Sequence, residues 1–316
     1  MFDLIIIGGA AVGCSAAVYA ARRKLNFKVV TDNIGGEVAL SGETNNWPGT
    51  QTIDGYELSQ AFYKHAQSYG VEFDEGWIVG EIVPTKNYHV VKAKNASGEE
   101  KTYETKTVII GTGIHPKKLG ISGEMKLDRK GITSCTVCDG PLFKNKDTVT
   151  IGAGNSGLES ALMMAGIAKN VYVLTKFANT PETQGGFPKG DKILIDKLKE
   201  IKNVKIIYEA KITEIVGETK VEGVKYTDAN GKEQALAVQG AMVHIGMIPN
   251  SGFATILKKN KQGEIVVDKL CHTNVPGIFA AGDVTDINHK QIVIAAGQGV
   301  TAALEAIGYI NLWKPT

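Results

Sequence analysis

Two glycine-rich turns, each between an expected strand and an expected helix, constrain the fold of this chain most. Residues 2–31 read FDLIIIGGAAVGCSAAVYAARRKLNFKVVT: an apolar run, a turn from Gly8 to Gly13, a small-residue helix and a second apolar run. A helix that begins after such a turn offers free N–H groups to a pyrophosphate. Ala10 holds the middle glycine position of G-x-G-x-x-G, so this unit alone leaves open a βαβ unit without a ligand.

A second unit at residues 148–175 reads TVTIGAGNSGLESALMMAGIAKNVYVLT and completes the pattern with Gly152, Gly154 and Gly157. One such match is weak evidence, but two well-separated copies are much stronger. We therefore expect two dinucleotide sites, and hence two cofactors that exchange a hydride. Asp32, after the first unit, is either a ligand of ribose hydroxyls or a solvated loop acid.

A third element follows in the C-terminal third, where VPGIFAAGDVTD (residues 275–286) ends an apolar strand at Gly282 beside Asp283. An Ala/Gly-rich helix is expected over Gln291–Ile307. An acid at a strand end is well placed to hydrogen-bond a ribityl chain, and the helix N-terminus is suited to the edge of a flavin ring.

The four cysteines divide into a close pair, Cys135 and Cys138, and the isolated Cys14 and Cys271. In a reducing compartment a close pair is more typical of metal binding or catalysis than of a structural disulfide. Zinc is disfavoured because the sequence has no second Cys-x-x-Cys and its six histidines are scattered. Cys14 and Cys271 are expected to be small buried hydrophobic residues. Between two dinucleotide sites, the pair indicates flavin-mediated disulfide chemistry.

Charge and hydropathy exclude other classes. The formal net charge is +2, with lysines and acids interspersed, so no nucleic-acid partner is expected. We find no apolar run long enough for a bilayer and no basic region of a signal peptide at the N-terminus. The sequence therefore predicts a cytoplasmic protein without a membrane partner.

Five motifs together resemble the low-molecular-weight thioredoxin reductases, a group of FAD-dependent pyridine nucleotide-disulfide oxidoreductases, over nearly the whole chain. They are NNWPG (45–49), IIGTG (109–113), SCTVCDG (134–140), GAGNSG (152–157) and GIFAAGDVTD (277–286). Three stretches, CDGPLFKNK (138–146), GNSGLESAL (154–162) and HKQIVIAAGQG (289–299), look closer to the reductase part of the alkyl hydroperoxide reductase flavoprotein. That relative carries an additional N-terminal thioredoxin-like module. Because this sequence starts at the flavin domain, we expect a separate thioredoxin-like or glutaredoxin-like protein to take the electrons.

The resemblance implies an α/β fold with two Rossmann-like, three-layer ββα dinucleotide-binding domains, the second inserted in the first. It places FAD in a domain of residues 1–112 and 246–316. A nicotinamide domain of residues 113–245 carries the cysteine pair. The crossovers at Ile110–Pro116 and Ile245–Phe253 are either a hinge pair or ordinary loops. A homodimer is also implied.

Residue roles follow from the same resemblance. Cys138 is expected to receive electrons from the flavin and Cys135 to exchange with the partner disulfide. Asp139 is expected to move the proton, although a helix N-cap role stays open. The expected FAD contacts are Gly8, Gly13, Gly36, Asn46, Thr112, Gly113, Gly282, Asp283, Gln291 and Ile292. The expected nicotinamide nucleotide contacts are Gly152, Gly154, Asn155, Gly157 and Lys176.

The electron donor stays open. NADPH-using relatives carry arginines after the strand that follows the second turn, but residues 173–192 (VLTKFANTPETQGGFPKGDK) contain none, and Lys176 is the one cation near the strand end. NADH users often place an acid where Thr175 stands. We therefore expect two cofactors, FAD and either NADPH or NADH. The alternatives are the same dithiol fed by ferredoxin or a deazaflavin, or an NADH oxidase that does not need the dithiol. Gly185, Gly186 and Pro188 predict a flexible insert at residues 178–191.

Overall fold

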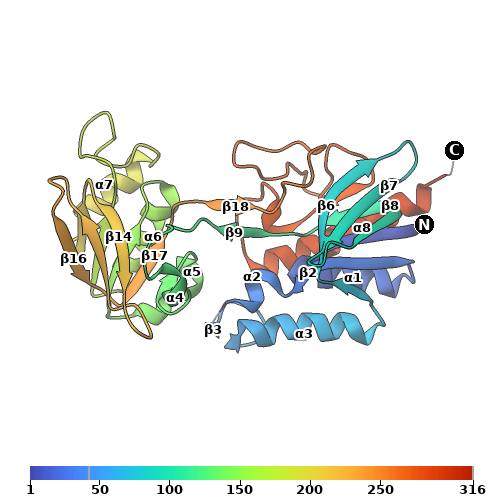
Figure 1. Cartoon of the computed structure of the whole chain (residues 1–316), viewed down its shortest axis with the longest axis horizontal. Coiled ribbons are helices and arrows are strands. Elements are labelled where there is room, and N and C mark those ends of the chain that lie inside the picture. The colour runs from blue at the N-terminus through green and yellow to red at the C-terminus, as the bar shows by residue number, and fades with distance from the viewer. Residues whose placement is uncertain (42, 315–316) are drawn as a thin grey trace. The chain divides into compact units, whose positions relative to one another are not determined.

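The computed structural model describes residues 1–41 and 43–314, which form two compact units. Unit 1 comprises Met1–His115 and Ile248–Thr316, and unit 2 comprises Pro116–Met247. The two connecting segments, β9 (Ile114–Pro116) and β18 (Met247–Pro249), pair with each other (Figure 1). Which cofactor each unit takes stays a prediction.

The core of unit 1 is a seven-stranded sheet in the order β5-β2-β1-β8-β7-β6, with β19 also paired to β8. The strands β5, β2, β1, β8 and β19 run parallel to one another, while β7 pairs antiparallel with both β8 and β6. These strands are β1 (Phe2–Gly9), β2 (Phe27–Ile34), β5 (Phe73–Glu75), β6 (Trp77–Pro84), β7 (His89–Asn95), β8 (Glu100–Ile110) and β19 (Ile278–Ala280).

Both faces of this sheet are covered, which explains the continuous apolar run of β1. Leu4 and Ile6 pack toward the helices, while Ile5 and Ile7 pack toward the antiparallel strands. Such two-sided burial is typical of parallel strands. The remaining elements of unit 1 are α1 (Ala11–Arg22), α2 (Gly36–Ala39), α3 (Gly55–Ser68), α8 (Ile292–Leu312), the short strands β3 (Glu43–Thr44) and β4 (Ile53–Asp54), and the 3-10 helix η2 (Gly282–Val284).

Unit 2 is also built in three layers, around a five-stranded parallel sheet in the order β10-β17-β11-β12-β13. Val171 and Val173 of β12 face the helices, whereas Tyr172 and Leu174 face a three-stranded antiparallel sheet. This alternation follows from the two-residue period of a strand. The sheet strands are β10 (Ile132–Thr133), β11 (Asp147–Ile151), β12 (Asn170–Leu174), β13 (Val204–Ile207) and β17 (Gly240–Val243). The other elements are α4 (Glu124–Leu127), α5 (Thr136–Asp139), η1 (Gly140–Phe143), α6 (Asn155–Ala165), α7 (Lys192–Glu200), β14 (Lys211–Val216), β15 (Gly223–Thr227) and β16 (Glu233–Ala237). The predicted fold class, with two Rossmann-like units, is confirmed.

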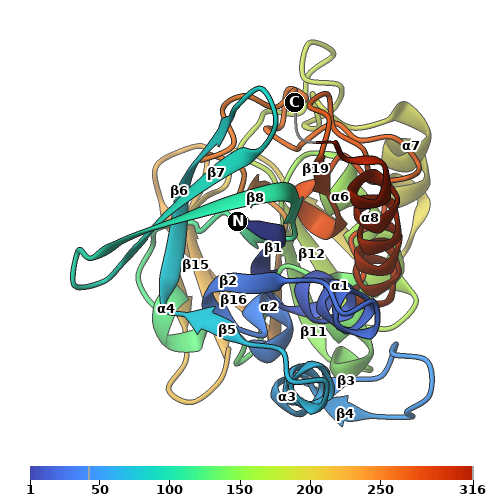
Figure 2. The same ribbon diagram turned by 90° about the vertical axis from the view of Figure 1, so that its right-hand side faces the viewer.

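One helix corrects the expectation that no apolar run is long enough for a bilayer. Within the described residues, α8 alone has the length and composition of a membrane span, with a mean hydropathy of 1.4 over its most apolar window. A third of that window is buried. Its small residues, Gly299 and Ala302 among them, pack against α1, and Figure 2 shows the two helices side by side. Core helices of globular units have the same composition, so α8 is weak evidence for a membrane.

Candidate active site

The first glycine turn joins β1 to α1, and close backbone contacts explain which of its glycines are needed. A Cβ atom on Gly13 would lie 1.8 Å from the carbonyl oxygen of Gly8, so only glycine allows the helix to come this close. Gly8 has φ +113°. Ala10, the N-cap of α1, has an extended backbone, which accommodates a side chain. The turn therefore forms without the middle glycine.

Other residues predicted to bind FAD lie beside this turn in unit 1. Gly282 donates its N–H to Gln298 Oε1 of α8 at 2.8 Å, and Val12 of α1 packs with Ala295 of α8 in one cluster. Asp283 follows Gly282 in η2. Burial raises the pKa of the Asp283 carboxyl, while the charge of Lys290 opposes the rise. The start of α1, the Gly282–Asp283 segment and the first turns of α8 thus form one region.

Two further predicted FAD contacts bond to each other. Asn46 Nδ2 donates to Gln291 Oε1 at 3.2 Å, although the residues are 245 positions apart. Gln291 is the N-cap of α8, so Ile292 begins that helix. The amide pair therefore ties the loop before β4 to the α8 N-terminus.

The remaining FAD candidates lie on turns of unit 1. Thr112 Oγ1 donates to the Asn250 carbonyl at 2.7 Å, and Asn250 Nδ2 donates to the Thr112 carbonyl at 2.8 Å. Gly113 follows with φ +68°. Gly36 begins α2, and its N–H donates to Asn33 Oδ1 at 3.2 Å. Sequence reasoning missed Asn250, because only folding brings it to a residue 138 positions away.

These residues fit a flavin dinucleotide. The narrow turn leaves backbone N–H groups at the α1 N-terminus for a pyrophosphate. Asp283 supplies an acceptor for hydroxyl groups, and the amides of Asn46 and Gln291 supply both donors and acceptors. The alternative for Asp32 is a solvated acid, and the structure exposes this residue at the end of β2.

The second glycine turn joins β11 to α6 in unit 2. A Cβ atom on Gly152 would lie 2.3 Å from the His244 carbonyl oxygen, and one on Gly157 would lie 2.9 Å from the Gly152 carbonyl oxygen. Gly154 is the N-cap of α6, and a Cβ atom there would meet no heavy atom within 4 Å. The protein itself therefore requires the outer glycines, whereas space beside Gly154 is open.

The insert predicted to be flexible is instead well packed. Phe187 is fully buried in the helix-side core, and Thr175 Oγ1 donates to the Gly186 carbonyl at 2.6 Å. Gly185 and Gly186 have φ +69° and +91°, so they serve a left-handed turn rather than mobility. The two glycines are therefore explained by the turn, and the mobility of the segment stays a prediction.

The insert also meets the start of α6. Asn155 Nδ2 donates to Asp191 Oδ2 at 2.9 Å, and the Asp191 N–H donates to Asn155 Oδ1 at 2.7 Å. Lys176 is exposed, with its ammonium group 5.3 Å from the centre of the Phe177 ring. Thr175, at the strand end, is buried and its hydroxyl group is already bonded within the protein.

A disulfide joins Cys135 and Cys138 in unit 2, with Cα atoms 5.3 Å apart. Cys135 is the N-cap of the one-turn helix α5, and its carbonyl accepts the N–H groups of Cys138 and Asp139 at 3.1 and 3.0 Å. In this oxidised form the two sulfurs are bonded to each other, as a redox-active pair requires. Cys14 and Cys271 are buried, as predicted, and burial raises the pKa of their thiols to about 12 and about 11.

Asp139 closes α5 and accepts a hydrogen bond from the Thr133 hydroxyl group. The same Thr133 oxygen accepts the Cys135 N–H at 3.0 Å. Burial raises the pKa of the Asp139 carboxyl, against the opposing effects of Thr133 and the charge of Arg129. Asp139 occupies the N-cap position of η1, as the alternative held, but its side chain makes no cap hydrogen bond there. Thr133 was missed, since a lone threonine carries no sequence signal.

Thr136, in the cysteine turn, contacts two further polar side chains, and of the three Thr136 and Ser160 are buried and His244 is half-buried. Thr136 Oγ1 is 2.6 Å from Ser160 Oγ and 2.9 Å from His244 Nε2. Burial lowers the pKa of His244 to about 4, so its ring is neutral at physiological pH. None of the three was predicted from the sequence.

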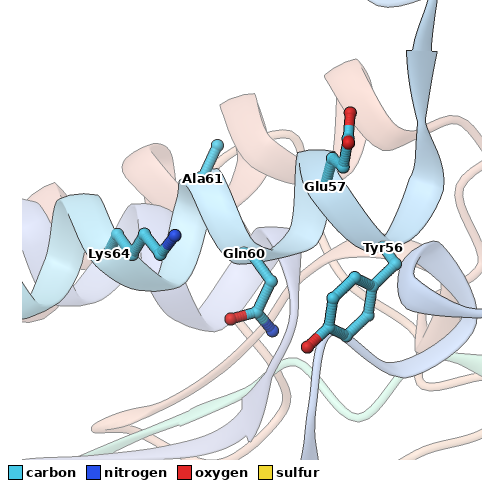
Figure 3. A pocket seen from close by; sticks show the side chains of 5 residues that line it. All are labelled: Tyr56, Glu57, Gln60, Ala61 and Lys64. Carbon is cyan, nitrogen blue, oxygen red and sulfur yellow. The ribbon is translucent and has the colours of Figure 1, made fainter.

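A pocket of about 270 Å³ lies elsewhere, on the outer face of α3. Figure 3 shows its lining residues along that helix: Tyr56, Glu57, Gln60, Ala61 and Lys64. It contains none of the residues predicted for the active site.

Comparison with known proteins agrees with this geometry. Residues 2–299 match the family model of the pyridine nucleotide-disulphide oxidoreductases. The F subunit of alkyl hydroperoxide reductase in Staphylococcus aureus (strain NCTC 8325 / PS 47) is 42% identical over 311 residues. That alignment covers 98% of this chain and 59% of the relative. The chain therefore spans less than two thirds of the length of the curated relatives that it matches.

Solved structures give the same result. The thioredoxin reductase from Streptococcus pyogenes MGAS5005 is 32% identical, with a TM-score of 0.90, over 99% of each chain. A ferredoxin-flavin thioredoxin reductase from Clostridium acetobutylicum is 25% identical, with a TM-score of 0.52, over 98% of each chain. The chain therefore has the fold of the thioredoxin reductases. The chain belongs to the pyridine nucleotide-disulphide oxidoreductase family.

Proposed function

We propose that this protein takes electrons from NADPH or NADH and passes them through FAD to Cys135 and Cys138. The dithiol then reduces a thioredoxin-like or glutaredoxin-like protein. The observation that supports this most is the Cys135–Cys138 disulfide, which lies in the same unit as a complete second glycine turn.

Unit 1 is the proposed FAD domain. The turn at Gly8–Gly13 binds the pyrophosphate, Asp283 orients the ribityl chain, and Asn46 and Gln291 contact the flavin. When bound, FAD supplies the two-electron chemistry that links a nicotinamide to a disulfide.

Unit 2 supplies the thiol chemistry. The Cys135 thiolate attacks the disulfide of the partner, which breaks that S–S bond, forms a mixed disulfide and releases one partner thiolate. Cys138 then attacks the Cys135 sulfur, so that the Cys135–Cys138 bond forms again and the second partner sulfur leaves. Two electrons pass to the partner, which takes up two protons. Asp139, whose pKa is raised by burial, is suited to hold a proton for a leaving sulfur.

The nucleotide preference is proposed to be weak. A charged hydrogen bond is worth about 1.5–3 kcal/mol, and residues 173–192 contain no arginine to form one with a 2′-phosphate. Lys176 is exposed just after β12 and is the candidate cation at the strand end. Thr175 stands where NADH users often carry an acid, so no carboxylate at this position is available for the ribose hydroxyl group of NADH.

A second candidate function uses ferredoxin or a deazaflavin as the donor to the same dithiol. The missing arginines and the likeness to the ferredoxin-flavin enzyme favour it. The complete second turn favours a nucleotide instead. An NADH oxidase has no need of a Cys-x-x-Cys, so the cysteine pair argues against it.

Stopped-flow mixing of the FAD-loaded protein with NADPH and with NADH, separately and without oxygen, decides between donors. We expect the flavin absorbance to fall with both nucleotides at comparable kcat/KM. If neither nucleotide bleaches the flavin, the donor is ferredoxin or a deazaflavin. A folded protein that does not take up FAD would contradict the proposal as a whole.

A further inference from the structure

Thr136, between the two redox cysteines in the sequence, is held by two polar contacts, a buried one to Ser160 and a part-buried one to His244. Its hydroxyl group lies 2.6 Å from Ser160 Oγ of α6 and 2.9 Å from His244 Nε2. Thr136 and Ser160 are each only 4% exposed. One hydroxyl group has one proton to donate and two lone pairs to accept, so it can satisfy both neighbours at once. The Thr136 side chain is therefore fixed in unit 2.

Both neighbours are connected to the second glycine turn. The His244 N–H donates to the Ile151 carbonyl at 2.7 Å, at the end of β11. The His244 carbonyl oxygen lies so close to Gly152 that a Cβ atom there would come within 2.3 Å. Ser160 is on α6, the helix that begins at this turn. The Thr136 hydroxyl group is thus the point where the cysteine turn and the nucleotide turn meet.

Reduction of the Cys135–Cys138 disulfide changes the cysteine end of this connection. When the Cys135–Cys138 bond takes up two electrons and breaks, each sulfur becomes a thiol or a thiolate, and the covalent closure of α5 is lost. Thr136 lies between the two cysteines in the sequence and begins α5, so a shift of α5 acts on its hydroxyl group. Close-packed interiors have little free volume in which to absorb such a shift. It therefore reaches His244, Ser160 and the backbone around Gly152.

We propose that Thr136 is a positioning residue that couples the redox state of the Cys135–Cys138 pair to the binding of a dinucleotide at Gly152–Gly157. This rests on the proposed function in one respect, namely that a dinucleotide binds the second turn. Coupling between two binding equilibria is reciprocal. Filling the turn must therefore shift the disulfide–dithiol equilibrium by the same factor by which reduction changes the affinity for the nucleotide.

The test uses the full chain loaded with FAD, and ADP-ribose as the probe. ADP-ribose has the pyrophosphate but no nicotinamide, so it cannot exchange a hydride. The protein is equilibrated with graded ratios of reduced and oxidised dithiothreitol, with and without saturating ADP-ribose. Alkylation and mass spectrometry then give the fraction of Cys135 and Cys138 present as thiols. Calorimetry gives the Kd for ADP-ribose in each redox state.

In the wild type we expect the midpoint ratio to shift about 5-fold or more, the lower end of known couplings, and the two Kd values to differ by the same factor. Thr136→Ser keeps the hydroxyl group and should keep the shift. Thr136→Val keeps the shape but makes neither contact, so the shift should disappear. Thr150→Val is a matched control, because the Thr150 hydroxyl group is buried without a partner in the described structure.

Three outcomes would overturn this proposal, and they differ in what they say of the proposed function. A full shift in Thr136→Val would show that Thr136 does not carry the coupling. If Thr136→Val does not fold, Thr136→Ala takes its place. Equal Kd values in the two redox states of the wild type would remove the coupling and leave the proposed function intact. Failure of ADP-ribose to bind in either state would contradict both.

Discussion

The two glycine turns form the same backbone bend with different sequences. In unit 1 the middle position is Ala10, and in unit 2 it is Gly154. The protein does not require glycine at either place, since Ala10 is extended and the space beside Gly154 is empty. It does require Gly13, where a Cβ atom would meet the Gly8 carbonyl oxygen at 1.8 Å. The outer glycines are thus needed for the backbone of the turn itself. Glycine at the middle position instead allows a ligand to approach the backbone closely.

The units also differ in their chemistry. Unit 1 gathers polar side chains from distant segments and has only buried cysteines with raised pKa values. Unit 2 has the disulfide, with Asp139 next to it. Substitutions should therefore affect the two units in separable ways.

The largest effect is expected from Cys135→Ser and Cys138→Ser. Each should abolish reduction of a thioredoxin-like partner, because a single sulfur cannot complete the exchange, while reduction of the flavin by the donor persists. Partner turnover and flavin absorbance measure the two steps. Cys14→Ala is the control, since that thiol is buried with a pKa of about 12 and should not take part. A single Ser variant that still turns over at the wild-type rate would refute the relay.

Asp139→Asn should slow the thiol steps by ~10²-fold or more, as is usual when a general acid is lost. In the wild type these steps should slow as pH rises through the raised pKa of Asp139, because the proton is then lost. The Asn variant should lack this dependence in rapid-mixing experiments over a pH series.

The proton on the Asp139 carboxyl group should also make the stability of the protein depend on pH. The folded protein keeps it at pH values where an ordinary carboxyl group, with a pKa near 3.8, has lost it. The free energy of unfolding should therefore fall as pH rises across that window, by at most about 1.4 kcal/mol per pH unit. An equally steep fall in Asp139→Asn would assign the slope to another group.

Gly13→Ala and Gly154→Ala test the steric difference between the turns. Gly13→Ala forces a methyl group against backbone and should cost about 1–3 kcal/mol or more. Gly154→Ala should cost less than about 1 kcal/mol, as for an N-cap change, yet weaken nucleotide binding. Thermal unfolding and ADP-ribose titration measure the two effects. A large loss of stability in Gly154→Ala would mean that unit 2 needs this glycine for its own folding.

The smallest effect is expected from Lys176→Ala. It should lower kcat/KM for NADPH by ~10-fold at most, the value of one weak charged hydrogen bond, and leave NADH unchanged. Lys202→Ala, an exposed lysine in the same unit, is the control. A strong NADPH preference that survives Lys176→Ala would mean that other residues hold the phosphate.

Local features were predictable from the sequence, and long-range contacts were not. The apolar run of β1, the two turns and α8 follow from patterns within a few residues. The Asn46–Gln291 bond and the Thr136–His244 bond join residues 245 and 108 positions apart, and no local pattern indicates such pairs. The mobility predicted for residues 178–191 was inferred from their glycines. In the structure, Phe187 anchors the loop and the glycines form its turn.

The α8 helix shows the same limit of prediction from local sequence. Its isoleucines, valines and alanines give it the hydropathy of a membrane span, although several of the alanines pack in the core with α1. Composition records how apolar a segment is, but not what covers it.

The central claim, that electrons from a nicotinamide reach the cysteine pair, can be tested by counting thiols. The FAD-loaded protein is mixed without oxygen with NADH or NADPH, quenched with acid and alkylated, and each cysteine peptide is quantified. We expect Cys135 and Cys138 to become alkylated only after the nucleotide is added, with Cys14 and Cys271 unchanged between the samples. Flavin that bleaches while Cys135 and Cys138 remain joined would contradict the account.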